Sequence, residues 1–181
     1  MNKTGTTSLH AALKALGFPS LHDGGPAVHD SVQRAIDEGV PLLSHVDRRY
    51  DAFSDIGLLA RRFRLLDVQY PGSRFVLTVR PVDEWVASRC RHVEQNQRRQ
   101  AVGRYTGDFL RVDEAAWEAE WNRHVDGARR YFRDRSDFVE IDLTADPSWG
   151  PICALLSVPQ PSRPFPKRNV SRASSRRIGR R

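Results

Sequence analysis

Apolar residues recur along the chain at two spacings, one typical of helices and one typical of strands. Leu9, Leu13 and Leu16 lie three and four residues apart, as on one face of a helix, and Gly17 follows as an expected helix end. Residues 74–79, Arg-Phe-Val-Leu-Thr-Val, are nearly all apolar and rich in β-branched side chains. This run predicts a strand that is buried on both faces, as in a parallel sheet.

Helical and extended patterns alternate along the rest of the chain. Helices are expected at residues 26–38, 56–69, from 82 onward, at 113–134 and at 149–156, and further strands at 48–55 and 137–142. The alternation predicts an α/β domain with a mainly parallel sheet. In such a domain, ligands bind at the carboxyl ends of the strands.

The composition is that of a globular protein, with 39% apolar and 28% charged residues in a chain of 181, enough for one domain. No apolar stretch reaches the roughly 20 residues of a membrane span. No signal-peptide pattern is present either, so a cytoplasmic protein is expected. The two cysteines, Cys90 and Cys153, lack the spacing of metal ligands, and no metal is expected.

The net charge of +7 is unevenly distributed along the chain. Residues 160–181 contain eight basic and no acidic residues, whereas the chain before them is nearly neutral. We therefore expect one domain over residues 1–158 and a basic, Pro/Ser/Arg-rich segment over 159–181 that is partly disordered. The high isoelectric point belongs to this segment, so it is weak support for nucleic-acid binding by the domain.

A short polar segment precedes the first predicted helix. Gly5 allows a tight bend there, and the amides of the first helical turn, together with the helix dipole, form an anion site. Neighbouring hydroxyls and one lysine add donors and positive charge, which suits phosphate or sulfate. A Walker A loop would have its lysine where Thr6 stands, so this segment is not one, and the plain alternative is a Ser/Thr-capped helix start. The segment consists of Lys3, Thr4, Gly5, Thr6, Thr7 and Ser8.

The order Lys-Thr-Gly-Thr-Thr-Ser-Leu resembles the 5′-phosphosulfate loop of sulfotransferases, the family that uses 3′-phosphoadenosine 5′-phosphosulfate (PAPS). In that family, an arginine at the end of a buried strand and a serine eight residues later bind the 3′-phosphate. Here Arg80 follows residues 74–79, and Ser88 comes eight residues after it. An arginine at a strand end can form a bidentate contact with phosphate. The motifs cover roughly residues 1–92.

The resemblance implies PAPS as co-substrate and a three-layer, P-loop NTPase-like fold with a parallel sheet flanked by helices. It also implies transfer of a sulfuryl group to a hydroxyl or amine of an acceptor, a small molecule or glycan that the sequence does not name. Members of the family often bring a basic segment near the C-terminus back over the cofactor. Lys167 and Arg168 are the candidates for that part, and a solvated basic tail is the alternative.

Sulfuryl transfer needs a base that takes the proton of the acceptor, and Lys3 suits the charge of the leaving phosphate. In the family, the base is a histidine or carboxylate, often at the end of the strand that precedes the arginine strand by one helix. Asp55 stands there and is the favoured candidate, with His45 and Asp47 as competitors. Asp55 is equally a candidate N-cap for the helix expected from residue 56.

Two departures from the family pattern stand out. Many members have a tryptophan directly after Gly-Thr-Thr, near the adenine, whereas this chain has Ser8. Trp85 could replace it, although a tryptophan packed in the core is favoured. In P-loop folds the phosphate loop also follows a central strand, but only Met1 and Asn2 precede Lys3. We therefore expect that the first strand is missing, because the start is truncated or misassigned, and that a short apolar strand belongs upstream.

Other functions remain open at this point. A P-loop nucleotide kinase is one alternative, although the Walker lysine is absent. A non-catalytic or truncated protein that binds anions or nucleic acid through the arginine-rich end is another, although the chain has no recognised nucleic-acid module. The sequence indicates no specific nucleic-acid partner, and the acceptor and the oligomeric state cannot be inferred from it.

Overall fold

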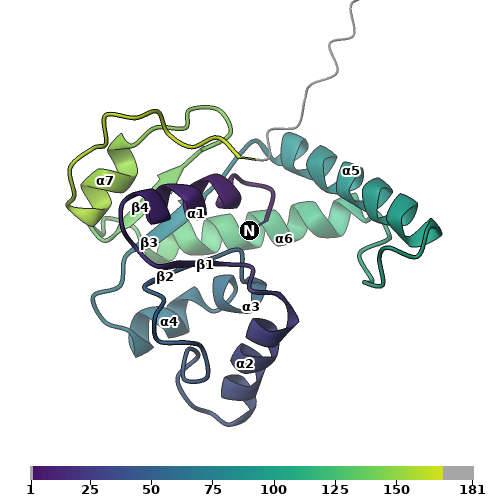
Figure 1. Ribbon diagram of the computed structural model, residues 1–181, viewed down its shortest axis with the longest axis horizontal. Coiled ribbons are helices and arrows are strands. Elements are labelled where there is room, and N and C mark those ends of the chain that lie inside the picture. Colours follow the sequence, from purple (N-terminus) through teal and green to yellow (C-terminus); the bar gives the residue numbers. More distant parts are fainter. Residues whose placement is uncertain (1, 169–181) are drawn as a thin grey trace, which may run out of the picture.

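Figure 1 shows the computed structural model, which describes residues 2–168. Helices and short strands alternate along these residues, so the predicted α/β class is confirmed. The basic segment beyond residue 168 lies outside the described residues. The helices are α1 (Thr6–Ala15), α2 (Gly25–Asp37), α3 (Gly57–Ala60), α4 (Phe63–Gln69), α5 (Val82–Ala101), α6 (Glu114–Tyr131) and α7 (Gly150–Leu156), and the strands are β1 (Ser20–His22), β2 (Ala52–Ser54), β3 (Phe75–Thr78) and β4 (Phe138–Ile141).

The strands of the described residues form two separate parallel pairs. β1 pairs with β2, with Ser20 beside Ala52, and β3 pairs with β4, with Phe75 beside Phe138. The predicted parallel direction is therefore correct. Within residues 2–168 the two pairs are not joined into the single sheet that the sequence led us to expect.

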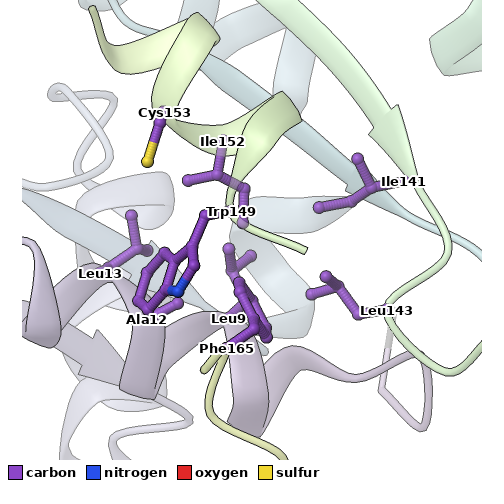
Figure 2. Packing of buried hydrophobic residues seen from close by; sticks show 9 residues of the cluster. All are labelled: Leu9, Ala12, Leu13, Ile141, Leu143, Trp149, Ile152, Cys153 and Phe165. Atoms are coloured by element: carbon purple, nitrogen blue, oxygen red, sulfur yellow. The ribbon is translucent and has the colours of Figure 1, made fainter. Parts of the chain in front are cut away.

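Helix α1 packs on β1 and β2, and α7 packs on β4. A cluster of buried apolar side chains, which we call the first cluster, joins α1, α7 and the segment around β4 (Figure 2). This cluster fixes the start of α1, and with it the polar segment that precedes the helix. Its members are Leu9, Ala12, Leu13, Ile141, Leu143, Trp149, Ile152, Cys153 and Phe165.

Helices α5 and α6 lie side by side and extend to the right in Figure 1. The second cluster lies between them and β3, and Leu77, Trp85 and Val93 belong to it. Apolar side chains on one face of the helix expected at 113–134 form a stripe that is buried in this cluster. The stripe consists of Trp117, Trp121, Val125, Ala128 and Phe132.

The third cluster holds α2 and α3 below the β1–β2 pair in Figure 1. The partly buried Phe53 of β2 packs against this cluster, and β2 also packs directly on α1. The buried members of the cluster are Val32, Leu42, Val46, Ile56 and Leu59.

The single helix expected at residues 56–69 is wrong. The chain forms α3 and α4 there, and the helix breaks at Arg62, whose φ and ψ are −110° and 27°. Leu59 packs into the third cluster, whereas Phe63 packs against the second, so the two halves face different parts of the core. The N-cap of α3 is Ile56 without a side-chain cap, so the capping role considered for Asp55 is also wrong.

The short strand β1 was not predicted, because three residues between a helix and a turn give no readable alternation. As for membrane insertion, no helix within residues 2–168 is both long and apolar enough to span a bilayer.

Candidate functional site

The polar segment before α1 forms a tight loop that only glycine allows at its centre. Gly5 is the N-cap of α1 with a φ of +88°, and a Cβ on it would lie 2.9 Å from the Cβ of Leu143. The first bond of the helix runs from the Leu9 amide to the Gly5 carbonyl, 3.0 Å apart. The amides before Leu9 therefore face the helix start, where the positive end of the helix dipole favours an anion.

Two contacts anchor this loop to β3 and α5. The hydroxyls of Thr4 and Thr78 are 2.6 Å apart, and both residues are buried. The indole N–H of Trp85 donates to the Asn2 carbonyl at 2.9 Å. Trp85 has no exposed surface, so it belongs to the core, as favoured from the sequence. The loop thus sits at the carboxyl end of β3.

A large cavity of about 1810 Å³, which we call the basic cavity, opens above the loop. Charged side chains from most of the chain line it, and basic groups outnumber acidic ones by nine to five. A site with this imbalance attracts anionic ligands, since low-dielectric walls focus the field of its charges. The basic residues are Lys3, Arg61, Arg64, Arg80, Arg89, Arg91, Arg123, Lys167 and Arg168, and the acidic ones are Asp23, Asp55, Glu84, Glu120 and Asp142.

The structure brings most of the sequence-predicted site residues to this cavity. Two are exceptions. Thr4 does not line it, because its side chain turns toward Thr78. His45 lies outside it, and its Nε2 is 2.6 Å from a carboxylate oxygen of Glu38 on α2. The predicted residues that line the cavity are Lys3, Gly5, Thr6, Thr7, Ser8, Asp55, Arg80, Ser88, Lys167 and Arg168.

Arg80 follows β3 and connects the loop to α5. One guanidinium nitrogen donates to the Lys3 carbonyl at 3.2 Å, and another lies 2.7 Å from Glu84. Its Nε is buried without a hydrogen-bond partner among the described residues. Ser88 lies about two turns further along α5 and lines the same cavity. Arg80 therefore holds the loop and still has a donor left for a ligand.

Lys3 and Asp55 face each other across the loop mouth. Burial lowers the pKa of the Lys3 ammonium, and the charge of Asp55 partly offsets that effect. Asp55 directly follows β2 and has a φ of +60°, so the strand end turns sharply at this carboxylate. A half-buried ammonium with a lowered pKa gains stability when an anion binds beside it.

His22, at the end of β1, is a site residue that the sequence reasoning missed. Its Nε2 lies 3.9 Å from Asp55 Oδ2 and 3.3 Å from Thr7 Oγ1, and its Nδ1 lies 3.0 Å from Ser54 Oγ. The ring also stacks on His10, with centroids 5.4 Å apart. The one signal that could have found it is its position: a histidine directly before an Asp-Gly-Gly turn, where a strand ends.

The C-terminal segment returns to the start of α1. The backbone amide of Arg168 donates to Ser8 Oγ at 2.9 Å. Phe165 anchors this segment in the first cluster, where its ring lies 4.9 Å from that of Trp149 (Figure 2). The Trp149 indole N–H also donates to the Arg163 carbonyl at 2.7 Å. Lys167 and Arg168 are both exposed and line the edge of the basic cavity.

Further titratable groups line the far wall of the cavity, on α5 and α6. The Arg89 guanidinium lies between the rings of Trp85, Phe109 and Trp117, 4.6 to 4.8 Å from their centroids, and its burial lowers its pKa. Burial also lowers the pKa of His92, and that of His124 to about 4. Both histidines are therefore neutral at pH 7 and can donate or accept hydrogen bonds without adding charge.

Residues 2–168 contain no group of three or more His, Cys, Asp or Glu side chains arranged to hold a metal ion. The groups that the described site offers to a ligand are amides, hydroxyls, ammonium and guanidinium groups, and carboxylates, of which Asp55 lies beside a histidine. Such a set can hold an anion with two separate phosphate-like groups and take a proton close to one of them.

The comparison with protein families gives one result. The family model described as "Sulfotransferase domain" matches residues 1–111 and 97–174 of the chain. These ranges include the loop before α1, Arg80, Ser88 and the returning segment. No curated protein gives a significant match.

Proposed function

The chain belongs to the sulfotransferase family, and on that basis we propose that it transfers a sulfuryl group from PAPS to a hydroxyl or amine of a small-molecule or glycan acceptor. One observation carries the proposal. Residues from the loop, the segment that follows β3, α5 and the returning segment line one cavity together with a carboxylate that can act as base. These segments lie far apart in the sequence, so their convergence supports a common ligand.

Under this proposal, PAPS binds in the basic cavity in one orientation. Its 5′-phosphosulfate lies on the amides at the start of α1, beside Lys3. Its 3′-phosphate lies between Arg80 and Ser88, and the buried Nε of Arg80 would gain a partner there. Lys167 and Arg168 add positive charge above the loop, close to Ser8.

In the proposed transfer step, Lys3, the loop amides and Asp55 each have a role. The bond between the sulfur and the bridging phosphate oxygen breaks as the acceptor oxygen or nitrogen bonds to the sulfur. The bond's electron pair leaves with adenosine 3′,5′-bisphosphate, and Lys3 and the loop amides stabilise that charge. Asp55 takes the acceptor's proton. His22, 3.9 Å from Asp55, positions this carboxylate.

Calorimetric titration of adenosine 3′,5′-bisphosphate tests the donor site. We predict that Arg80→Ala weakens its binding by roughly 10- to 100-fold, because a charged hydrogen bond is worth about 1.5 to 3 kcal/mol. The matched control is Arg98→Ala, which removes an exposed arginine that pairs with Glu94 on the same helix, outside the cavity.

Equal affinity of the Arg80→Ala variant and the unchanged protein would contradict the assignment. Since Arg80 also holds the Lys3 carbonyl, Ser88→Ala serves as a second variant that leaves this contact intact. Tighter binding of ATP with Mg²⁺ than of the bisphosphate would instead favour the nucleotide kinase considered from the sequence.

A further inference from the structure

Three arginines that line the basic cavity have no part in the proposed donor site. Arg61 caps the end of α3, Arg64 belongs to α4, and Arg123 belongs to α6. The four basic groups assigned to PAPS come instead from the loop, the segment after β3 and the returning segment. We call the surface that carries these three arginines the arginine wall, and PAPS alone does not account for its charge.

Contacts between α6 and the α3–α4 segment hold the arginine wall together. The Arg61 guanidinium lies 3.2 Å from a carboxylate oxygen of Glu120. The Arg64 guanidinium lies 5.5 Å from the centroid of the Tyr131 ring. Arg123 follows Glu120 by three residues on α6, so the two side chains are neighbours on the helix surface, and both line the cavity.

Positive charge exceeds negative charge on this wall. Glu120 pairs with Arg61, whereas Arg64 and Arg123 form no ion pair with a carboxylate within residues 2–168. A guanidinium group binds a carboxylate, sulfate or phosphate through two parallel hydrogen bonds. The arginine wall therefore suits an anionic group of a second ligand.

The arginine wall begins beside the proposed base. Helix α3 starts two residues after Asp55, and a Cβ on Gly57 would lie 3.4 Å from a terminal nitrogen of Arg61. The Arg61 guanidinium thus lies back over the start of α3, next to the segment that carries Asp55. A second ligand can therefore reach Asp55 with one group and the arginine wall with another.

Two rings and a glycine complete this part of the cavity. Phe63 and His124 pack edge to face, with centroids 6.0 Å apart. Burial lowers the pKa of His124 to about 4, so the ring adds no charge at pH 7. Gly127 is buried, and a Cβ on it would meet no described atom within 4 Å outside its own helix. All three residues line the cavity, so the ring of a phenol or sugar can pack on them.

We propose that the acceptor is an anion, whose carboxylate or other oxyanion binds Arg61, Arg64 and Arg123 while its hydroxyl or amine lies at Asp55. This inference rests on the sulfuryl transfer proposed above and specifies the class of its acceptor. The anionic group forms no bond to sulfur and keeps its charge, so it orients the acceptor without entering the transfer step.

Matched acids and amides test the inference on the unchanged protein. The compounds p-hydroxybenzoate, p-hydroxyphenylacetate and p-hydroxyphenylpropanoate carry the carboxylate at increasing distance from the hydroxyl, and methyl glucuronide adds a sugar acid. Each acid is compared with its own amide as acceptor for sulfur-labelled PAPS. We expect kcat/KM for the best acid to exceed that for its amide by roughly tenfold or more, because hydrogen bonds to a charged group are strong.

A double variant locates the preference in the structure. Replacing Arg64 and Arg123 together by glutamine should reduce the ratio of acid to amide at least roughly threefold and leave the affinity for adenosine 3′,5′-bisphosphate unchanged. The matched control replaces Arg130 and Arg133, which are exposed and outside the cavity, by glutamine. It removes the same charge and should keep the ratio.

Transfer at equal kcat/KM to acids and amides would overturn the inference and leave the proposed function standing. Binding of the bisphosphate without transfer to any of the acids would also overturn it, since these compounds carry both groups that it requires. An unchanged ratio in the Arg64/Arg123 double variant would do the same. Failure to bind the bisphosphate, together with no transfer to any compound, would contradict the proposed function itself, and the inference with it.

Discussion

Asp55 and its neighbours show how few side chains the proposed chemistry needs. Asp55 lies 3.9 Å from His22 and close enough to Lys3 to oppose the lowering of its pKa by burial. The carboxylate thus faces a cation in the resting site. In the proposed mechanism, binding of the donor's phosphate to Lys3 would give that cation a second anionic partner and would leave Asp55 able to accept a proton.

Replacing the Asp55 carboxylate tests its role in sulfuryl transfer separately from the binding of the donor. We predict that Asp55→Asn lowers the rate of sulfuryl transfer by about 10² to 10⁴, the usual contribution of a general base, and leaves the affinity for adenosine 3′,5′-bisphosphate within a few-fold. Transfer to water and to a panel of phenols and alcohols, measured with sulfur-labelled PAPS, gives the rate.

His45→Asn provides the comparison, because the sequence offered His45 as a competing base and the structure places it outside the cavity, beside Glu38. Transfer should be nearly unchanged in this variant. A large loss in His45→Asn together with full activity in Asp55→Asn would reverse the assignment of the base.

Side chains within one motif could be predicted from the sequence, and isolated ones could not. Lys3 to Ser8 are contiguous at the start of α1, and Arg80 and Ser88 stand eight residues apart in a motif that resembles that of the family, so the sequence could name them as candidates. His22 contacts Thr7, Ser54 and Asp55, which belong to other segments of the chain. The spacing of these residues along the sequence gives no sign that their side chains meet in the fold.

At the scale of chain segments, the position of the returning C-terminal segment depends on a single aromatic side chain. Phe165 is 8% exposed and packs against Trp149, while Lys167 and Arg168, just after it, are exposed. The Pro/Ser/Arg-rich composition suggested a solvated tail, because composition does not reveal one apolar ring among basic residues. The segment's position follows from tertiary packing.

Removing this anchor should affect stability and binding together. We predict that Phe165→Ala destabilises the protein by about 3 kcal/mol and weakens adenosine 3′,5′-bisphosphate binding, because Lys167 and Arg168 lose their fixed position. Urea unfolding and calorimetry measure the two effects. Val102→Ala, at a site that is 65% exposed, is the control for stability. A loss of stability with unchanged affinity would show that the basic pair does not contribute to the site.

The longer elements agree with the sequence because their patterns span several turns. Helix α6 and strand β3 fall within the ranges that the apolar stripe and the apolar run predict. Residues 56–69 were predicted as one helix because their apolar positions are dense, yet Leu59 and Phe63 belong to different clusters. Periodicity cannot distinguish one helix on a single core from two helices on neighbouring cores.

For the molecule as a whole, the fold concentrates charge that the sequence spreads out. The first 159 residues are nearly neutral, yet seven of their basic side chains line one cavity together with Lys167 and Arg168. They come from positions between Lys3 and Arg168, so no charge run marks the site. The separation of the strands into two pairs within residues 2–168 is likewise a property of tertiary packing, which the local pattern of a single strand does not report.

The comparison of two nucleotides on the unchanged protein is the measurement to make first. Adenosine 3′,5′-bisphosphate and adenosine 5′-monophosphate differ only by the 3′-phosphate that we assign to Arg80 and Ser88. We predict that the bisphosphate binds roughly 10- to 100-fold more tightly, as expected for one charged phosphate contact. Equal affinity for the two nucleotides, or binding of neither, would contradict a PAPS site in the basic cavity.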